Sequence, residues 1–207
     1  MKTTPSETMD FGSGPDLLSR IEAYATLHQI PIIKSEGIAF LRQIIRIAHV
    51  KRVLEIGTAI GYSSLAMAIA TAVSIVTIER DPDMARQAAK TIESSGFADR
   101  IRLIYADAFD LDIETLGTFD LLFIDAAKGQ NLPLFQKYER CIPSGGVIVI
   151  DNLGFHGFVE HPDTIQSRDR RQMIQKIQQF NEWLLHNERF DASIYDFGDG
   201  IGLAIKK

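Results

Sequence analysis

The sequence contains a single cysteine among its 207 residues, so no disulfide can form within the chain and a cysteine-based zinc site is excluded. It also lacks any apolar run near the roughly 18 residues that read as a membrane span. The first residues, Met1 to Glu7, contain no apolar stretch of the kind found in secretion signals. We therefore expect a cytoplasmic chain that has no membrane partner.

Basic residues are in the minority, with 22 Lys and Arg against 27 Asp and Glu and a formal net charge of −5. This balance argues against a protein that coats nucleic acid nonspecifically, although it leaves open a local basic patch that reads one RNA feature. The length is typical of one compact α/β domain. Residues 1–207 are therefore expected to form a single domain.

Apolar periodicity predicts strands that alternate with helices over most of the chain. Two amphipathic helices within residues 16–49 come first and are expected to form an accessory cap. Short apolar runs then predict buried strands at 53–56, 74–78, 101–104, 119–124 and 147–150, with helices at 62–70, 83–94 and 131–140 between them. A long helix follows, with a stripe of Met173, Ile177, Phe180 and Leu184, and a hairpin of 192–197 and 201–205 closes the chain. The pattern predicts an α/β fold with a parallel sheet and an antiparallel C-terminal hairpin.

A turn with two glycines follows the first predicted strand. Gly57 and Gly61 lie where that strand becomes a helix, and glycines there let the backbone approach a ligand at the helix N-terminus. Glu79 ends the second strand and can accept both hydroxyls of a ribose, while Glu55 is expected near the cationic end of the ligand. Because the third glycine of Gly-x-Gly-x-x-Gly is missing, an adenosyl ligand is favoured over a dinucleotide. A tight turn with a surface Glu79 is the alternative.

Carboxylates also end the fourth and fifth predicted strands. Asp125 closes one strand, and Asp151 and Asn152 close the next. If these strands are neighbours, their side chains supply three oxygen ligands of the kind that Mg²⁺ prefers. Lys128 follows Asp125 by about one helical turn, and a nearby divalent cation would lower its pKa, which makes a general base plausible. The alternative is that each Asp caps a following helix or turn.

These motifs together resemble the metal-dependent O-methyltransferases of the catechol and caffeoyl-CoA type. The resemblance is carried by the segments 55–63, 77–79, 107–108, 123–128 and 151–152. It implies a Rossmann-like seven-stranded methyltransferase sheet with helices on both faces and an antiparallel last strand, with S-adenosylmethionine as the methyl donor. It also implies a homodimer whose N-terminal helices lie near the interface or the acceptor site.

The resemblance implies a role for each matching residue. Asp125, Asp151 and Asn152 would hold Mg²⁺ or another hard divalent cation, and Lys128 and Asp125 would be catalytic. Glu79 would bind the ribose, Asp107 and Ala108 the adenine, and 57–63 the methionine portion. The full set expected to bind the cofactor is Ile33, Glu55, Gly57, Thr58, Ala59, Gly61, Tyr62, Ser63, Glu79, Arg80, Asp107, Ala108 and Asp125.

Within that family the chain is similar to the bacterial tRNA 5-hydroxyuridine methyltransferases, on the segments 124–130, 168–171, 180–184 and 198–200. This similarity implies conversion of 5-hydroxyuridine to 5-methoxyuridine at the wobble position of the tRNA anticodon loop. The 5-oxygen and 4-carbonyl of 5-hydroxyuracil can chelate a metal much as catechol oxygens do. Arg168, Arg170 and Arg171 are then expected to contact tRNA phosphates.

Three hypotheses from different classes stay open, and the tRNA methyltransferase is the first of them. The arginines can equally form a solvated helix face, in which case the chain methylates free small molecules of the catechol or caffeoyl-CoA type. A noncatalytic scaffold that has kept the fold is a third reading, and the intact set of Asp125, Lys128, Asp151 and Asn152 argues against it. A dehydrogenase is a distant fourth.

Overall fold

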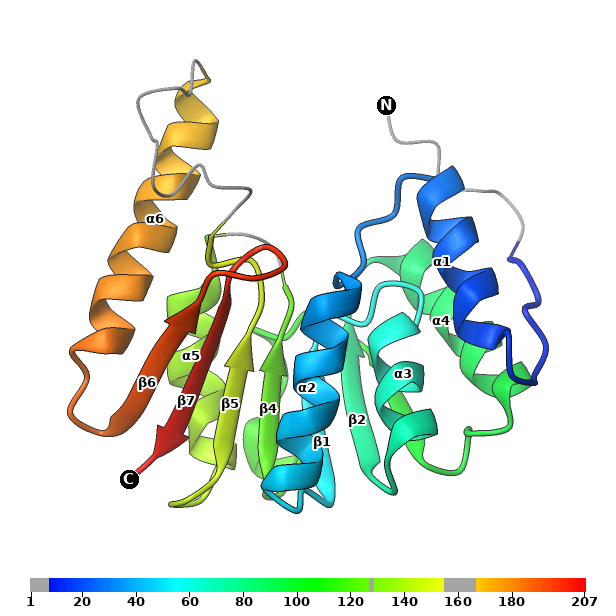
Figure 1. The fold of residues 1–207 in the computed structure, drawn as a ribbon, viewed down its shortest axis with the longest axis horizontal. Helices are drawn as coiled ribbons and strands as arrows, with labels where there is room; N and C mark the ends of the chain where they lie inside the picture. Colours follow the sequence, from blue (N-terminus) through cyan, green and yellow to red (C-terminus); the bar gives the residue numbers. More distant parts are fainter. Residues whose placement is uncertain (1–7, 127–128, 155–166) are drawn as a thin grey trace.

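The computed structural model describes residues 8–126, 129–154 and 167–207, which form a seven-stranded sheet covered by helices (Figure 1). The strand order is β3-β2-β1-β4-β5-β7-β6. The first five strands are parallel to one another, and β7 runs antiparallel to both β5 and β6. The strands are β1 (Arg52–Ile56), β2 (Ser74–Glu79), β3 (Ile101–Tyr105), β4 (Leu121–Ile124), β5 (Val147–Ile150), β6 (Phe190–Tyr195) and β7 (Ile201–Lys206).

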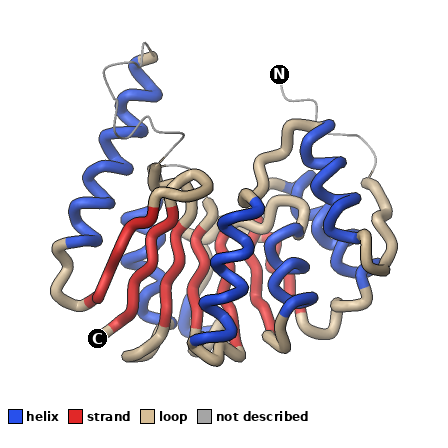
Figure 2. The backbone as a smooth tube through the Cα atoms, in the orientation of Figure 1, coloured by secondary structure: helices blue, strands red, loops and turns tan. Residues whose placement is uncertain are grey.

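Helices pack on both faces of the sheet because its central strands are apolar on both sides. Leu121 and Phe123 of β4 join one buried cluster, and Leu122 and Ile124 join the other. The first cluster is covered by α1 (Leu17–Leu27), α2 (Ser35–Ile47), α3 (Tyr62–Ala70) and α4 (Pro82–Ser95). The second is covered by α5 (Asn131–Tyr138) and α6 (Arg168–Leu185), with short 3-10 turns at Ile113–Thr115 and Glu139–Cys141. Figure 2 shows these layers.

The predicted α/β fold with an antiparallel C-terminal hairpin is confirmed, and the bounds of three elements differ from the predicted ones by two residues. The fourth strand begins at Leu121 rather than at Phe119, because the Phe119 amide donates to the carbonyl of Cys141 instead of joining a ladder. The helix expected to reach residue 140 ends as α5 at Tyr138 and continues as a 3-10 turn. In the hairpin, the sixth strand spans Phe190–Tyr195 rather than 192–197.

The buried stripe of α6 also differs by one position. Ile174, Ile177, Phe180 and Leu184 are its buried residues, whereas Met173 is only partly buried. Ile174 precedes Ile177 by three positions and Met173 precedes Ile177 by four, so both spacings suit a helical stripe.

The carboxyl ends of β1, β2, β4 and β5 lie along one edge of the sheet because these strands are parallel. In open α/β sheets, ligands bind outside this edge. None of the helices in the described ranges combines the length and the apolar character that a membrane crossing requires.

Candidate active site at the carboxyl edge of the sheet

The turn after β1 passes directly over the end of β4. Gly57 has a φ of +101° and its amide donates to the carbonyl of Ile78 at 3.0 Å. A Cβ at this position would overlap the backbone carbonyl oxygen of Asp125, so only glycine lets the two segments approach. The Asp125 amide in turn donates to the Ile56 carbonyl at 2.9 Å. The first turn and the end of β4 are therefore one joined surface.

The carboxylate of Glu79 is held by backbone amides at the end of β2. Its Oε2 accepts from the Ala59 amide at 2.8 Å, and its Oε1 accepts from the amides of Arg80 and Asp81 at 2.9 and 2.8 Å. These three bonds fix the carboxylate between the turn after β1 and the start of α4. Since a carboxylate oxygen has more than one acceptor site, Glu79 can still accept hydroxyl groups from the adjacent cavity.

Glu55 lies inside the protein rather than at a ligand. Its side chain is fully buried and accepts hydrogen bonds from the hydroxyls of Ser63, Ser64 and Thr77. Burial raises the pKa of the Glu55 carboxyl above its ordinary value, the three hydroxyls oppose this effect, and the negative charge of Glu79 adds to it. The expectation that Glu55 faces the cationic end of a ligand is corrected: the carboxylate supports the turn after β1 from within.

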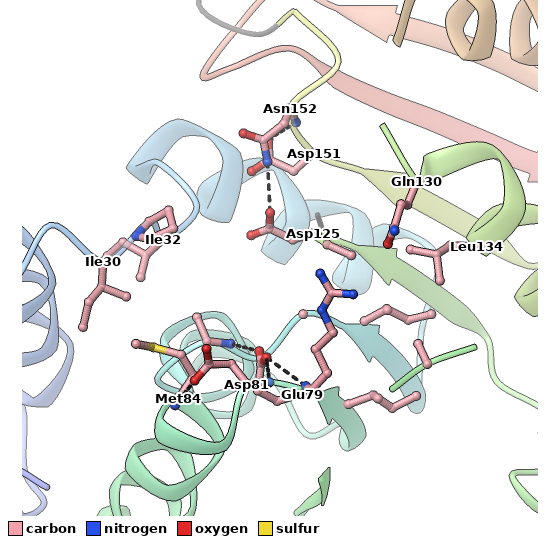
Figure 3. A pocket seen from close by; sticks show the side chains of 18 of the residues that line it. Ile30, Ile32, Glu79, Asp81, Met84, Asp125, Gln130, Leu134, Asp151 and Asn152 are labelled. Atoms are coloured by element: carbon pink, nitrogen blue, oxygen red, sulfur yellow. Dashed lines mark hydrogen bonds between the residues drawn. The ribbon is translucent and has the colours of Figure 1, made fainter. Parts of the chain in front are cut away.

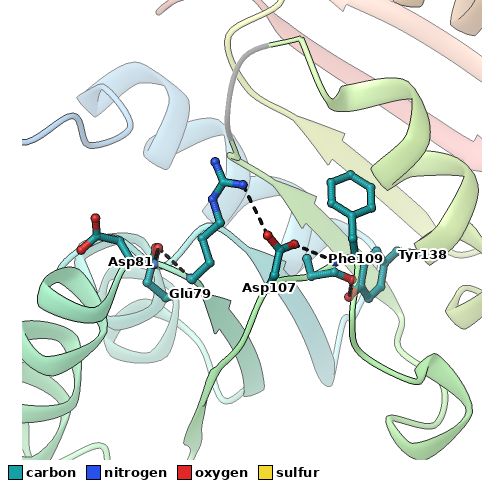
Figure 4. A network of polar contacts seen from close by, with 7 residues as sticks. Glu79, Asp81, Asp107, Phe109 and Tyr138 are labelled. Atoms are coloured by element: carbon teal, nitrogen blue, oxygen red, sulfur yellow. Dashed lines mark hydrogen bonds and ion pairs between the residues drawn. The ribbon is translucent and has the colours of Figure 1, made fainter.

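A second polar group lies beyond β3. Asp107 Oδ1 accepts from the Phe109 amide at 2.9 Å, and its Oδ2 lies 3.4 Å from Arg80 Nη1 (Figure 4). The hydroxyl of Tyr138 donates to the Ala108 carbonyl at 2.6 Å, and burial raises the pKa of Tyr138. These contacts hold Asp107 and Ala108 beside Glu79.

The three residues predicted to bind a cation come together. Asn152 Nδ2 donates to Asp125 Oδ1 at 2.9 Å across the neighbouring ends of β4 and β5 (Figure 3). Asp151 is 7% exposed, and its Oδ1 accepts from the Asn152 amide at 2.8 Å. No group of three His, Cys, Asp or Glu side chains in the described ranges has a metal-binding arrangement, so the candidate site combines two carboxylates with one amide.

This donor set fits a hard divalent cation. Two carboxylates and an amide supply oxygen ligands, and Mg²⁺ commonly keeps waters or substrate oxygens in its remaining positions. Rotation of the Asn152 amide about its last side-chain bond would turn Oδ1 toward the position that Nδ2 now occupies. The residues present are therefore compatible with the predicted Mg²⁺ site.

These groups line one cavity of about 600 Å³ (Figure 3). Nine of the predicted residues are among its lining residues, namely Gly57, Ala59, Glu79, Arg80, Asp107, Ala108, Asp125, Asp151 and Asn152. Further wall residues were not assigned to the site from the sequence. They include Ile30, Ile32 and Lys34 between α1 and α2, Asp81 at the N-cap of α4, Met84 of α4, and Asp199 in the turn between β6 and β7.

Other predicted cofactor residues lie behind the cavity wall. Ile33 packs in the core at 3% exposure, and the Thr58 hydroxyl contacts that of Thr77. Gly61, with a φ of +91°, is the N-cap of α3. The Tyr62 hydroxyl donates to Glu22 of α1, and Ser63 bonds to Glu55. Ile33 lies between α1 and α2, and the others shape the turn after β1 and the start of α3. None of them is among the residues that line the cavity.

The remaining predicted residues are Lys128 and the three arginines. Lys128 lies outside the described residues. Arg168, Arg170 and Arg171 form the exposed first turn of α6, which begins beyond the carboxyl edge of the sheet (Figure 1). The Ser167 hydroxyl caps this helix by accepting from the Arg170 amide at 3.5 Å.

Comparisons with known proteins agree with this geometry. A family model described as O-methyltransferase matches residues 16–207. A catechol O-methyltransferase of Niastella koreensis is 32% identical over 196 residues, which cover 89% of this chain and 86% of that protein. A catechol O-methyltransferase of Mycobacterium tuberculosis is 33% identical over 173 residues, covering 79% of this chain and 78% of that protein. The crystal structure of an SAH-bound methyltransferase from Podospora anserina superposes with a TM-score of 0.81 at 26% identity, covering 94% of this chain and 89% of that one.

Proposed function

Because the chain belongs to the O-methyltransferase family, we propose that it transfers a methyl group from S-adenosylmethionine to a hydroxyl of a small molecule of the catechol or caffeoyl-CoA type. The observation that carries this proposal is the shared cavity: Glu79, a candidate ribose ligand, and the Asp125, Asp151 and Asn152 cluster line the same space. Catechol O-methyltransferases among the relatives support the choice of acceptor.

The residues around Glu79 form the half of the cavity that we propose for the donor. Glu79 would accept the ribose hydroxyls, since its own position is set by three backbone amides. Asp107 and Ala108 would face the adenine beside it. When bound, S-adenosylmethionine supplies an electrophilic methyl group on its sulfonium.

The residues at the ends of β4 and β5 form the half that we propose for the acceptor. Asp125, Asp151 and Asn152 would hold a divalent cation such as Mg²⁺, which supplies Lewis acidity that lowers the pKa of an acceptor hydroxyl when it is bound. We propose Lys128 as the group that takes the hydroxyl proton, from its place three residues after Asp125. Holding acceptor and donor in register on a rigid sheet edge would supply much of the rate.

A second candidate acceptor is 5-hydroxyuridine at the tRNA wobble position. The observation in its favour is the position of Arg168, Arg170 and Arg171, which are exposed at the start of α6, beyond the same edge of the sheet as the cavity (Figure 1). Arginines in this place could bind the phosphates of an anticodon loop. The cavity chemistry is the same for both acceptors, because each offers two neighbouring oxygens.

One experiment separates the two acceptors. The purified chain is incubated with labelled S-adenosylmethionine and Mg²⁺, and a simple catechol and tRNA containing 5-hydroxyuridine are offered in parallel. Methylated catechol with little 5-methoxyuridine supports the small-molecule enzyme, and the reverse supports the tRNA enzyme. Replacing Arg168, Arg170 and Arg171 by Ala should abolish tRNA methylation and spare catechol turnover. If the variant keeps both activities, these arginines do not contact the RNA.

We also propose that the chain acts in the cytoplasm as a homodimer. Leu27 of α1 and Ile47 of α2 are large apolar side chains that are 77% and 74% exposed. They lie on the N-terminal helices, which the family resemblance places near the interface or the acceptor site. Light scattering of the purified chain tests the dimer. A monomer mass at micromolar concentration would contradict it.

A further inference from the structure

Three segments far apart in the sequence meet at the acceptor end of the cavity. They are the chain between α1 and α2, the chain after β5, and the turn between β6 and β7, which lie at one edge of the sheet in Figure 1. Lys34 Nζ lies 2.6 Å from Asp199 Oδ1 and 3.1 Å from the Gly198 carbonyl oxygen. Lys34 and Asp199 both line the cavity with Asp125, Asp151 and Asn152.

The β6–β7 turn is in turn bound to the chain after β5. The Gly154 amide donates to the Asp199 carbonyl at 2.8 Å, and the Leu153 amide donates to the Gly200 carbonyl at 2.9 Å. Gly200 has a φ of +83°, and a Cβ there would overlap the Gly154 amide nitrogen. The two segments are therefore in direct backbone contact, and a displacement of the turn would be transmitted to Leu153 and Gly154.

Asn152 needs such support because of its own backbone conformation. Its φ is +69°, in the left-handed region that residues other than glycine adopt less readily. Leu153, the next residue, is fully buried, and its carbonyl accepts from Asn181 Nδ2 of α6 at 3.1 Å. Contacts on Leu153 and Gly154 thus hold the backbone that directs the Asn152 side chain toward Asp125.

We infer that Lys34 and Asp199 are positioning residues for the cation site: their ion pair holds the β6–β7 turn, and the turn holds Asn152 in place beside Asp125. The inference rests on the proposed function, because it takes Asp125, Asp151 and Asn152 as the cation ligands. Neither Lys34 nor Asp199 is itself a ligand in this scheme. Their effect passes through backbone hydrogen bonds.

The test measures Mn²⁺ binding to the full-length chain by electron paramagnetic resonance, without methyl donor or acceptor. Simple electrostatics predicts that Lys34→Met, which removes a positive charge from the cavity wall, tightens Mn²⁺ binding. If Lys34 positions the cation site, the opposite change in affinity is expected. Lys34→Met should then weaken Mn²⁺ binding about threefold, the scale of a partly exposed ion pair. Lys34→Arg, which keeps a cationic donor, should retain the affinity of the unmodified chain.

A matched control is Arg140→Met, which breaks an ion pair with Glu114 that is more exposed and lies away from the cavity. It should leave Mn²⁺ affinity unchanged. In a chain that carries Asn152→Ala, Lys34→Met should have no further weakening effect, because the residue that it positions is gone. Thermal unfolding of each variant establishes that the fold is kept.

The outcomes separate this inference from the proposed function. If the unmodified chain binds Mn²⁺ and Lys34→Met binds it equally well or more tightly, the positioning role is overturned while the cation site stands. If the unmodified chain binds no Mn²⁺, the proposed cation site fails and the inference fails with it. Weaker binding in Lys34→Met together with recovery in Lys34→Arg supports the inference.

Discussion

Asn152 Nδ2 lies 2.9 Å from Asp125 Oδ1, so the side chains that end two neighbouring strands are in direct contact. This contact depends on the parallel pairing of β4 with β5, in which Ile124 and Ile150 are register partners. Asp125 and Asp151 each follow such a partner by one residue. Strand register alone therefore places the two candidate carboxylate ligands side by side.

Replacement of Asp125 by Asn should lower Mg²⁺-dependent methyl transfer by orders of magnitude. The change preserves the shape of the side chain and removes a charged oxygen ligand, which hard cations require. Initial rates at saturating donor measure the effect, and thermal unfolding shows whether the fold is intact. Asp191→Asn, at an exposed position on β6, is the matched control and should keep full activity. Full activity in the Asp125 variant would contradict the assignment.

Glu79→Gln should weaken binding of the donor product S-adenosylhomocysteine by about 10- to 100-fold, the usual scale of hydrogen bonds to a charged group. Gln keeps one acceptor oxygen but places an NH₂ group where backbone amides already donate to Glu79. Isothermal titration calorimetry measures the affinity. Glu114→Gln, at a surface ion pair, is the control. Equal affinity in Glu79→Gln and the unmodified chain would remove the ribose role.

Gly57→Ala should destabilise the protein more than Gly96→Ala does. Both glycines have positive φ, at +101° and +85°, so alanine is strained at each by about 1 kcal/mol or more. A Cβ at Gly96 meets nothing within 4 Å, whereas one at Gly57 overlaps the Asp125 carbonyl. The difference between the two unfolding free energies in urea measures the cost of that overlap. Equal losses would show that the turn and the end of β4 can separate freely.

The stability of the chain relative to Glu55→Gln should fall as the pH rises above about 4.5, the ordinary pKa of a Glu carboxyl. Burial raises the folded-state pKa of Glu55, so the folded protein binds this proton more tightly than the unfolded chain. The resulting stabilisation is complete below the unfolded pKa and is lost as the pH rises through the folded one. Urea unfolding of both proteins at pH 5 and pH 8 measures the change. A difference in unfolding free energy between the two proteins that is the same at both pH values would contradict this prediction.

The central strands β4 and β5 were predictable because each is a short apolar run buried on both faces. Val147–Ile150 matches its predicted bounds for this reason. Phe119 was misassigned to a strand because its side chain is as deeply buried as that of Leu121, and burial leaves the same apolar signal in a turn as in a ladder. Only the hydrogen-bond partner of the Phe119 amide distinguishes a turn from a strand at this position.

The site was predictable where it follows directly from strand ends. Glu79, Asp125, Asp151 and Asn152 each end or follow a parallel strand, so one rule about sheet edges locates them. Lys34 and Asp199 are separated by 165 residues and meet only through tertiary packing, which no local pattern encodes. Glu55 was expected near the ligand because it lies just before the Gly57 turn. In the structure its side chain is buried against Ser63 and Ser64 of α3, a tertiary contact that no local pattern encodes.

The most direct test of the proposed chemistry is methyl transfer from labelled S-adenosylmethionine to a catechol, first in the presence of EDTA and then after Mg²⁺ is added in excess. If Asp125, Asp151 and Asn152 hold a cation on which the reaction depends, EDTA abolishes product formation and Mg²⁺ restores it. Undiminished methylation in EDTA would contradict the cation-dependent mechanism.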